Sequence, residues 1–464
     1  MKYVIFTFEG NGFPIAKRLI DEGQDVLVGQ VEDFTKTLTG FEKKAGLIEP
    51  PEEKKQRLKR YDHMLTKISA DKLLEKLKKI SDPENYFIFF DSNNLFYYAE
   101  QLQSLGFHGN FPTEEDREFE IDRDKAKEFV KKYYPHLAIA SKRTFRKISE
   151  AKKFLKASKS IWVLKSQTDM LPTFVPETNN VGLAKAQILE TLEVFRRGYE
   201  ESGFLLEKRI DSLIEVTPEK YYYNGTALGM DINIENKFIG SGNISMQVGC
   251  AGDLIIPISM KSKIHDIAFP PIVDKLAKQH KGLFLWDASL LIDEKTGEIY
   301  FGEFCPNRPG YNSIFTLLEQ ASSVHEFFEK CTKKEEPFSL GTVGASLMTF
   351  NILRGKDDEL LPDATIDITA SAAPHVWGYD FYKKTPSDYT RTVGYDLHLA
   401  PITGSEKNIT KAVDMLYAHL EGFTATRAYY RPRFDFLSTD YPSSIMNRLH
   451  YCLKKGLFTL SFPL

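Results

Sequence analysis

Two carboxylates flank a short turn in residues 283–304, and their spacing suits the binding of a hard cation. Asp287 lies in one apolar stretch, and Glu303 lies near the end of the next, after the turn Glu-Lys-Thr-Gly. Such a pair of stretches predicts adjacent antiparallel strands, so that both carboxylates can face one pocket. Mg²⁺ takes one or two carboxylates and completes its octahedron with waters and phosphate oxygens. The alternative is an ordinary hairpin with solvent-facing acids.

Asn307 and Arg308 follow this hairpin closely. The amide oxygen of Asn307 is a neutral ligand for a hard cation, and the Arg308 guanidinium suits a phosphate. If the strand ends at Cys305, the turn through Pro306 would carry the Asn307 oxygen back toward Glu303, replacing a thiol that Mg²⁺ binds poorly. Alternatively, Asn307 only caps the turn.

Two lysines stand where a predicted element can aim an ammonium group. Lys165 ends a predicted strand at 161–166, and Lys125 opens a predicted helix at 124–134. Ammonium groups in such places neutralise phosphate oxygens during phosphoryl transfer. The alternative for each lysine is a solvated surface group.

The segment 204–215 suits an adenosine site. A predicted strand ends in Glu207-Lys208-Arg209-Ile210, and Glu215 lies eight residues after Glu207. The backbone of the strand could bond the adenine edge, and Glu215 could accept hydrogen bonds from ribose hydroxyls. A plain amphipathic strand with surface charges explains this segment nearly as well.

The elements around these residues predict several domains, because 464 residues are too many for one hydrophobic core. A strand at 2–8, a glycine turn, a helix and a second strand form a βαβ unit, which predicts a Rossmann-like α/β domain over 1–118. Mixed α+β structure with glycine-turn meanders predicts a two-lobed domain over 119–335. Mixed strands and a helix at 408–421 predict a small capping domain over 336–464.

The composition is that of a soluble globular protein, with 42% hydrophobic and 27% charged residues. The formal net charge of -3 argues against a general nucleic-acid binder. The four scattered cysteines predict neither a disulfide scaffold nor a zinc site, and they fit a reducing cytoplasm. No uncharged apolar run approaches the roughly 20 residues of a membrane span, so no membrane partner is expected.

The order of four segments resembles the ATP-grasp superfamily. The segments are Asp124–Pro135, Val163–Ser166, Glu207–Glu215 and the stretch from Trp286 to Gly310. Within the superfamily the chain is most similar to phosphoribosylamine–glycine ligases, also called glycinamide ribonucleotide synthetases. The likeness extends from Glu9–Ala16, through 238–252, to the C-terminal segment 427–436.

The resemblance implies a cytoplasmic ligase of purine biosynthesis that joins a small-molecule carboxylate to an amine through an acyl-phosphate, using ATP and Mg²⁺ or Mn²⁺. The residues implied in ATP binding are Lys125, Lys165, Glu207, Lys208, Ile210 and Glu215. Glu303 would bind the metal with Asp287, Asn307 being the candidate third ligand, and Lys165 and Arg308 would be catalytic.

The chain departs from the family mainly on the substrate side. The N-terminal loop continues as Gly12-Phe13-Pro14, Cys305 stands where the family has a metal-binding asparagine, and no glycine follows Lys165 before Gly182. Two further hypotheses therefore remain: a ligase for a different acid and amine, and a non-catalytic nucleotide-binding or scaffold protein. A dehydrogenase would rest on the N-terminal βαβ unit alone, and its loop lacks the third glycine of the dinucleotide fingerprint.

Overall fold

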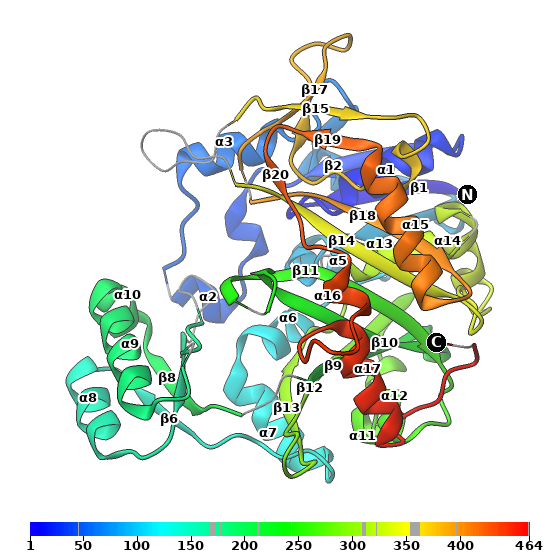
Figure 1. Ribbon diagram of the computed structural model, residues 1–464. Helices are drawn as coiled ribbons and strands as arrows, with labels where there is room; N and C mark the ends of the chain where they lie inside the picture. The colour runs from blue at the N-terminus through cyan, green and yellow to red at the C-terminus, as the bar shows by residue number, and fades with distance from the viewer. Residues whose placement is uncertain are drawn as a thin grey trace.

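The computed structural model describes residues 1–44, 46–166, 173–176, 178–210, 214–242, 244–308, 312–321, 323–352, 362–395, 397–462 and 464. The fold is mixed, with a parallel N-terminal sheet followed by antiparallel sheets, which confirms the predicted fold class (Figure 1). Among the described residues, no helix combines the length and apolarity needed to cross a membrane.

The N-terminal sheet is parallel, with strand order β3-β2-β1-β4-β5. Its strands are β1 (Lys2–Thr7), β2 (Val26–Gln30), β3 (Lys67–Ser69), β4 (Tyr86–Phe90) and β5 (His108–Gly109). Its helical segments are α1 (Gly12–Asp21), η1 (Phe34–Thr37), α2 (Gly40–Lys44), α3 (Pro51–Lys59), α4 (Ala70–Leu77), η2 (Pro83–Asn85), η3 (Asn93–Leu95), α5 (Phe96–Leu102) and α6 (Glu114–Ile121). Residues 3–6 of β1 are fully buried, as in a parallel sheet covered on both faces. The predicted βαβ unit is thus confirmed.

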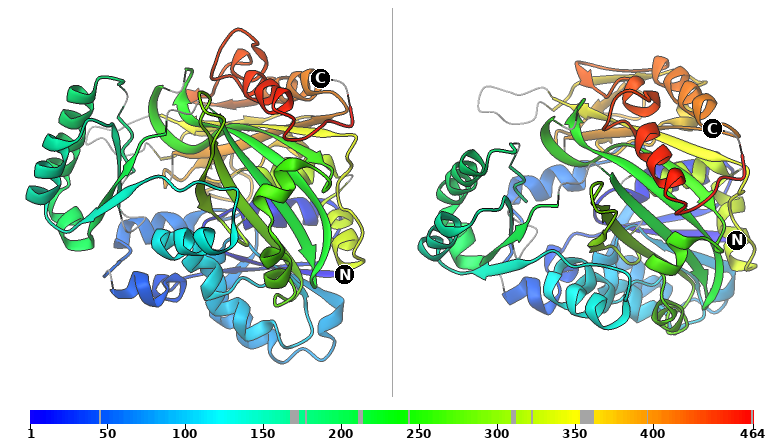
Figure 2. Two further views of the ribbon diagram at one scale, coloured as in Figure 1. Left: turned by 90° about the horizontal axis from the view of Figure 1, so that it is seen from below. Right: turned by 60° about the horizontal axis from the view of Figure 1, so that its bottom comes forward.

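A small lobe projects to one side of the body (Figures 1 and 2). Its antiparallel sheet has the order β6-β8-β7 and its own hydrophobic core. The strands are β6 (Lys142–Phe145), β7 (Trp162–Ser166) and β8 (Phe204–Lys208), and the helices are α8 (Ile148–Ala157), α9 (Val181–Val194) and α10 (Arg196–Ser202). Helix α7 (Arg123–Tyr133) precedes the lobe in the chain.

The main sheet is antiparallel and has eight strands in the order β13-β12-β9-β10-β11-β14-β18, with β20 paired to β14. The strands are β9 (Ile214–Tyr223), β10 (Thr226–Gly240), β11 (Ile244–Ile258), β12 (Leu283–Ile292), β13 (Ile299–Phe304), β14 (Val343–Asn351), β18 (His398–Glu406) and β20 (Ala428–Tyr429). The accompanying helices are α11 (Lys263–Ala268), α12 (Pro271–Ala277), α13 (Ser313–Gln320), α14 (Val324–Thr332), α15 (Ile409–Glu421), α16 (Phe434–Leu437) and α17 (Ile445–Lys454). Because β14 pairs with β11, the sheet continues across the boundary expected near residue 335.

A smaller antiparallel sheet, β16-β17-β15-β19, completes the C-terminal part. Its elements are β15 (Thr365–Ile368), η4 (Ala373–His375), β16 (Phe381–Tyr382), β17 (Thr390–Thr392) and β19 (Phe423–Ala425). This part packs on the N-terminal domain, where Tyr61 donates its backbone N–H to the Phe381 carbonyl at 2.7 Å and its hydroxyl to the Gly378 carbonyl at 2.8 Å. One hydrophobic core runs through the N-terminal, central and C-terminal parts.

The strand register gathers acidic side chains on one face of the main sheet. Asp287 on β12 lies opposite Glu219 on β9, which in turn lies opposite Asp231 on β10. Since side chains alternate along a strand, Glu215 and Glu235 point to the same face as these three. The fold thus builds a polar face in its central sheet.

Candidate functional site

Two lysines share one carboxylate in the interior beside the small lobe. Lys165 on β7 donates to Glu207 on the neighbouring β8 at 2.9 Å, and Lys127 on α7 binds the other oxygen of Glu207. All three side chains are largely buried. Burial and then the charges of Arg123 and Lys127 lower the pKa of Lys165 to about 7. Burial and then the positive charge of Arg123 lower the pKa of Lys127 to about 8. The group has more cations than anions and suits an anionic ligand.

Lys237 on β10 forms ion pairs both with the β12–β13 hairpin and with Glu215 on β9. Its ammonium lies 2.8 Å from Glu215, 3.7 Å from Glu235 and 3.8 Å from Glu303. Glu215 also accepts a hydrogen bond of 2.6 Å from Ser289 on β12. Burial opposes the charge of Lys237, but the carboxylates prevail and raise its pKa well above the usual value. Glu215 and Glu303, which come from the two segments singled out in the sequence, therefore both lie beside Lys237.

The carboxylates beside Lys237 offer oxygen ligands. Glu303 keeps 39% of its side chain exposed and lies 3.9 Å from Arg123. Burial, then Glu219, Glu235 and Glu303, raise the pKa of Asp287 well above its usual range. Both oxygens of Asp231 are buried without a hydrogen-bond partner among the described residues. A divalent cation would relieve this crowding of carboxylates, and an all-oxygen set is the kind that Mg²⁺ prefers.

Lys125 lies outside this group. Its ammonium binds Glu118 at 2.8 Å and Glu115 at 3.6 Å. Residues two apart on a helix point about 200° apart, so the ammonium groups of Lys125 and Lys127 leave α7 in nearly opposite directions. Lys127, which the sequence did not single out, therefore takes the place facing Glu207. The signal was present in the sequence, because Lys127 adjoins the buried stripe of Ala126 and Val130.

Asn307 is held by β12 and α6. Its amide oxygen accepts from the Leu285 backbone N–H at 3.1 Å, and its amide NH₂ donates to Asp116 at 2.9 Å. Its own N–H bonds the Leu285 carbonyl, and its φ of 51° is left-handed. The oxygen is thus committed to the end of β12 and is not offered to Glu303, which is the arrangement of a turn cap. Burial raises the pKa of the Cys305 thiol well above its usual value.

The remaining predicted nucleotide contacts lie at the end of β8. Lys208 has an exposed side chain, and Ile210 is half-buried just beyond the strand. The backbone N–H of Lys208 bonds the Ser141 carbonyl at 2.8 Å. The loop after Lys165, and most of the chain between Ile210 and Glu215, lie outside the described residues.

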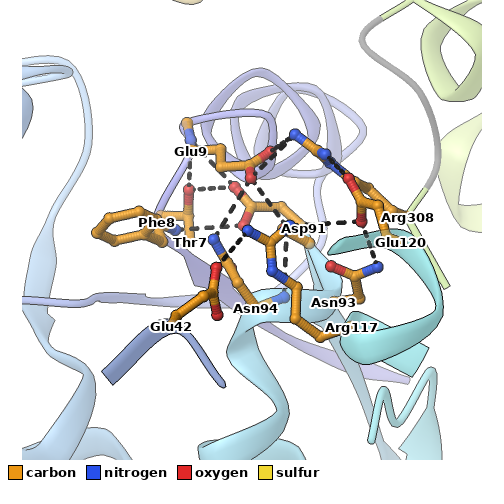
Figure 3. Close-up of polar contacts among 12 residues, drawn as sticks. Thr7, Phe8, Glu9, Glu42, Asp91, Asn93, Asn94, Arg117, Glu120 and Arg308 are labelled. Carbon is orange, nitrogen blue, oxygen red and sulfur yellow. Dashed lines mark hydrogen bonds and ion pairs between the residues drawn. The ribbon is translucent and has the colours of Figure 1, made fainter. Parts of the chain in front are cut away.

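Arg308 lies where the hairpin meets the N-terminal loop (Figure 3). It pairs with Glu120 on α6 and, at 3.2 Å, with Glu9. Arg308 also lies near enough to help lower the pKa of Glu303 against the effect of burial, after the larger contributions of Lys237, Arg123 and Lys165.

The N-terminal loop is filled by a carboxylate of the chain itself. Asp91 accepts from the backbone N–H groups of Phe8, Gly10 and Gly12 at 3.2, 3.1 and 3.0 Å, and from the Thr7 hydroxyl. Burial raises the pKa of Asp91 to about 6. In a dinucleotide-binding domain, amides in this position hold a pyrophosphate. Here they are already occupied, which argues against the dehydrogenase hypothesis.

Structural comparison finds similar folds among solved enzymes. The chain matches a phosphoribosylamine–glycine ligase from Thermotoga maritima with a TM-score of 0.61 and 13% identity, over 93% of this chain and 99% of that one. It matches the biotin carboxylase domain of 2-oxoglutarate carboxylase from Hydrogenobacter thermophilus with a TM-score of 0.56 and 13% identity, over 99% and 96% of the two chains. It matches an L-amino acid ligase from Bacillus licheniformis with a TM-score of 0.52 and 12% identity, over 93% and 99%.

The chain has the ATP-grasp fold. No protein-family model and no curated protein matches its sequence. In this ATP-grasp chain, the small lobe supplies Lys165 and Glu207, and the main sheet supplies Glu215, Lys237 and Glu303. These are residues of both sheets brought to one place.

Proposed function

We propose that the protein is an ATP-dependent carboxylate–amine ligase that works through an acyl-phosphate. The observation that carries the proposal is the pair Lys165 and Lys127, buried around one carboxylate beside the acidic group of the main sheet. Phosphate oxygens would take up the surplus positive charge of these lysines. Their ammonium groups would then stabilise the negative charge on the transferred phosphoryl group. The ATP-grasp ligases of similar fold support this chemistry.

The nucleotide would lie between the small lobe and the main sheet. Glu207, Lys208 and Ile210 at the end of β8 would line the adenine pocket, and Glu215 would hold the ribose. Lys125 would not contact the phosphates directly, since its ammonium group pairs with Glu118.

Glu303 and Asp287 would hold Mg²⁺ or Mn²⁺, which neutralises phosphate charge when it is bound. The residues fit a hard cation, because neighbouring carboxylates raise the pKa of Asp287 and the oxygens of nearby Asp231 have no hydrogen-bond partner among the described residues. The described geometry of Asn307 does not add a third ligand, so waters and phosphate oxygens would complete the coordination.

The acid and amine of the phosphoribosylamine–glycine ligase reaction, a step of purine biosynthesis, are the first pair to test. A different pair is the second candidate, and the surroundings of Arg308 favour it. This guanidinium faces both Glu9 and Glu120, and Asp91 fills the loop beside it. Because Glu9 and Glu120 already engage the guanidinium that would bind the phosphate of a phosphosugar, we propose an amine without a phosphate.

The test is release of ADP that depends on both an added acid and an added amine. A panel of amino acids and amines, phosphoribosylamine included, would be assayed with MgATP. We expect one pair to stimulate release, and Lys165→Met to abolish it while Lys152→Met, an exposed lysine of the same lobe, does not. ATP binding without stimulated release for any pair would favour the non-catalytic alternative.

A further inference from the structure

Two histidines and a glutamate meet in the C-terminal part of the fold, and the proposed ligase chemistry does not use them. Glu319 comes from α13, His375 from η4 and His419 from the last turn of α15. One nitrogen of each imidazole and one oxygen of Glu319 lie within 4.8 Å of one another. All three side chains are partly buried.

The hydrogen bonds at this group determine which histidine nitrogens carry lone pairs. His419 Nδ1 lies 2.7 Å from the Thr403 carbonyl oxygen, which can only accept, so Nδ1 carries the proton. Its Nε2 is therefore left with a lone pair while the ring is neutral. Burial, against which the Thr403 bond acts, lowers the pKa of His419 and favours that neutral form. His375 Nδ1 lies 2.7 Å from Glu319 Oε1.

Thr403 on β18 positions two of the three side chains. Its hydroxyl donates to the second oxygen of Glu319 at 2.8 Å and accepts from the Trp377 indole N–H at 2.9 Å, while its carbonyl orients His419. Metal-binding histidines commonly donate their other N–H to a backbone carbonyl or a carboxylate in this way, which fixes the tautomer and the orientation of the ring.

We propose that Glu319, His375 and His419 form a binding site for a transition-metal dication of the zinc class. Two imidazoles and one carboxylate are ligands that Zn²⁺, Co²⁺ and Ni²⁺ accept readily, whereas Mg²⁺ prefers oxygen alone. The scattered cysteines had pointed away from zinc. The histidines that supply the site are remote in sequence, so no short spacing motif announces them.

Binding requires a small rearrangement of the rings. The imidazoles of His375 and His419 are stacked, 3.6 Å apart and within 6° of parallel, and lone pairs lie in the ring planes. Tetrahedral Zn²⁺ with bonds of about 2.0–2.1 Å holds its ligand atoms about 3.3 Å apart, so one ring must rotate about its Cβ–Cγ bond. His375 has 26% of its side chain exposed and can turn, and this exposure leaves the remaining coordination position open to solvent.

Such an ion would cross-link three elements that are far apart in the chain. Helix α13 belongs to the central segment, while η4 and α15 belong to the C-terminal segment. Metal bound to the native state only would raise the melting temperature, because it adds its binding free energy to folding. The site is separate from the proposed MgATP site in residues and in ligand type, so each can fail without the other.

The experiment is a titration of untagged, chelator-treated protein with Co²⁺ in the absence of nucleotide, followed by visible absorption. We expect a single strong equivalent with d–d bands of a four- or five-coordinate ion, displacement by Zn²⁺, and a rise in melting temperature with Zn²⁺. His375→Gln and His419→Gln should each lower the affinity by at least about 10-fold.

The controls separate this site from other ligands of the chain. His136→Gln replaces an exposed histidine and should bind as the native protein does, as should Glu303→Gln. Melting without metal shows that the variants are folded, and the exposure of His375 makes that substitution mild. Absence of Co²⁺ uptake by the native protein, or unchanged uptake by folded His375→Gln, would overturn the proposal.

Discussion

Burial destabilises the charged carboxylate of Asp91, while four hydrogen bonds to it stabilise the same charge. The substitution Asp91→Asn separates the two effects. An asparagine oxygen can keep the three bonds to Thr7, Gly10 and Gly12, which share one carboxylate oxygen. The amide NH₂ would then face the Phe8 N–H, which loses its acceptor. A buried donor left unsatisfied costs about 1–3 kcal/mol. The variant is also relieved of a buried charge.

The size of that relief follows from the pKa of Asp91. The folded protein raises this pKa from 3.8 to about 6. A shift of about two units corresponds to about 3 kcal/mol between the two protonation states. The folded state keeps its proton between pH 4 and 6 while the unfolded chain loses it, so the native protein loses stability as pH rises through this window. The loss levels off about one pH unit above the folded pKa of Asp91.

The assay is calorimetric melting of the native protein and of Asp91→Asn from pH 4.5 to 7.5, compared at each pH. The variant should be less stable at the acid end and should gain about 2 kcal/mol on the native protein as pH rises from 4.5 to 7.5, because part of the native loss has already occurred at pH 4.5. Asp25→Asn, an exposed aspartate of the same domain, should show no such trend. A difference between native and variant that does not change with pH would refute the reasoning that burial outweighs the four donors.

Four further outcomes are expected. Lys165→Met should weaken nucleotide binding by about 10- to 150-fold in calorimetric titration, the loss of one charged hydrogen bond; equal affinity would remove Lys165 from the site. Glu303→Gln should lower turnover and raise the Mg²⁺ concentration needed for half-maximal turnover in the ADP assay, and an unchanged Mg²⁺ requirement would contradict the metal assignment. Asn307→Ala should lower the unfolding free energy by about 1–3 kcal/mol and leave metal affinity unchanged, because its oxygen serves Leu285; weaker metal binding would restore it as a ligand. In metal-free protein, the lowered pKa of His419 should cost stability as pH falls below about 6.5, since the unfolded chain takes up the proton first, and His419→Gln should flatten that part of the melting profile.

Local patterns carried most of what could be predicted from the sequence. The hairpin holding Asp287 and Glu303, and the βαβ unit, follow from apolar alternation and turn residues within some 20 positions. The prediction named Lys125 and not Lys127, because it considered the position of the lysine in the helix but not the direction in which its side chain points. Helix phase decides which of two lysines faces Glu207, and it requires the buried stripe to be weighed as well as the position in the helix.

Long-range pairing accounts for what could not be predicted. Lys237 lies on a polar strand face that becomes a site only when β9, β12 and β13 join β10 in one sheet. The predicted hairpin places Asn307 just after its second strand. The hydrogen bonds of Asn307 to Leu285 and Asp116, however, depend on tertiary packing of the turn against β12 and α6. Glu319, His375 and His419 have no local signal at all, since three separate elements must pack before they meet.

The pairing of β11 with β14 also bears on how this protein can be divided. Leu254 and Ile255 of β11 lie opposite Ala345 and Gly344 of β14. A fragment ending near residue 335 would leave that apolar strand as an open edge, and open edges recruit strands from other chains. Such a fragment should aggregate when it is expressed alone. Recombination with a relative at this point would likewise exchange strands of a shared sheet, so residues 336–464 can be inherited or engineered only together with the strand they complete.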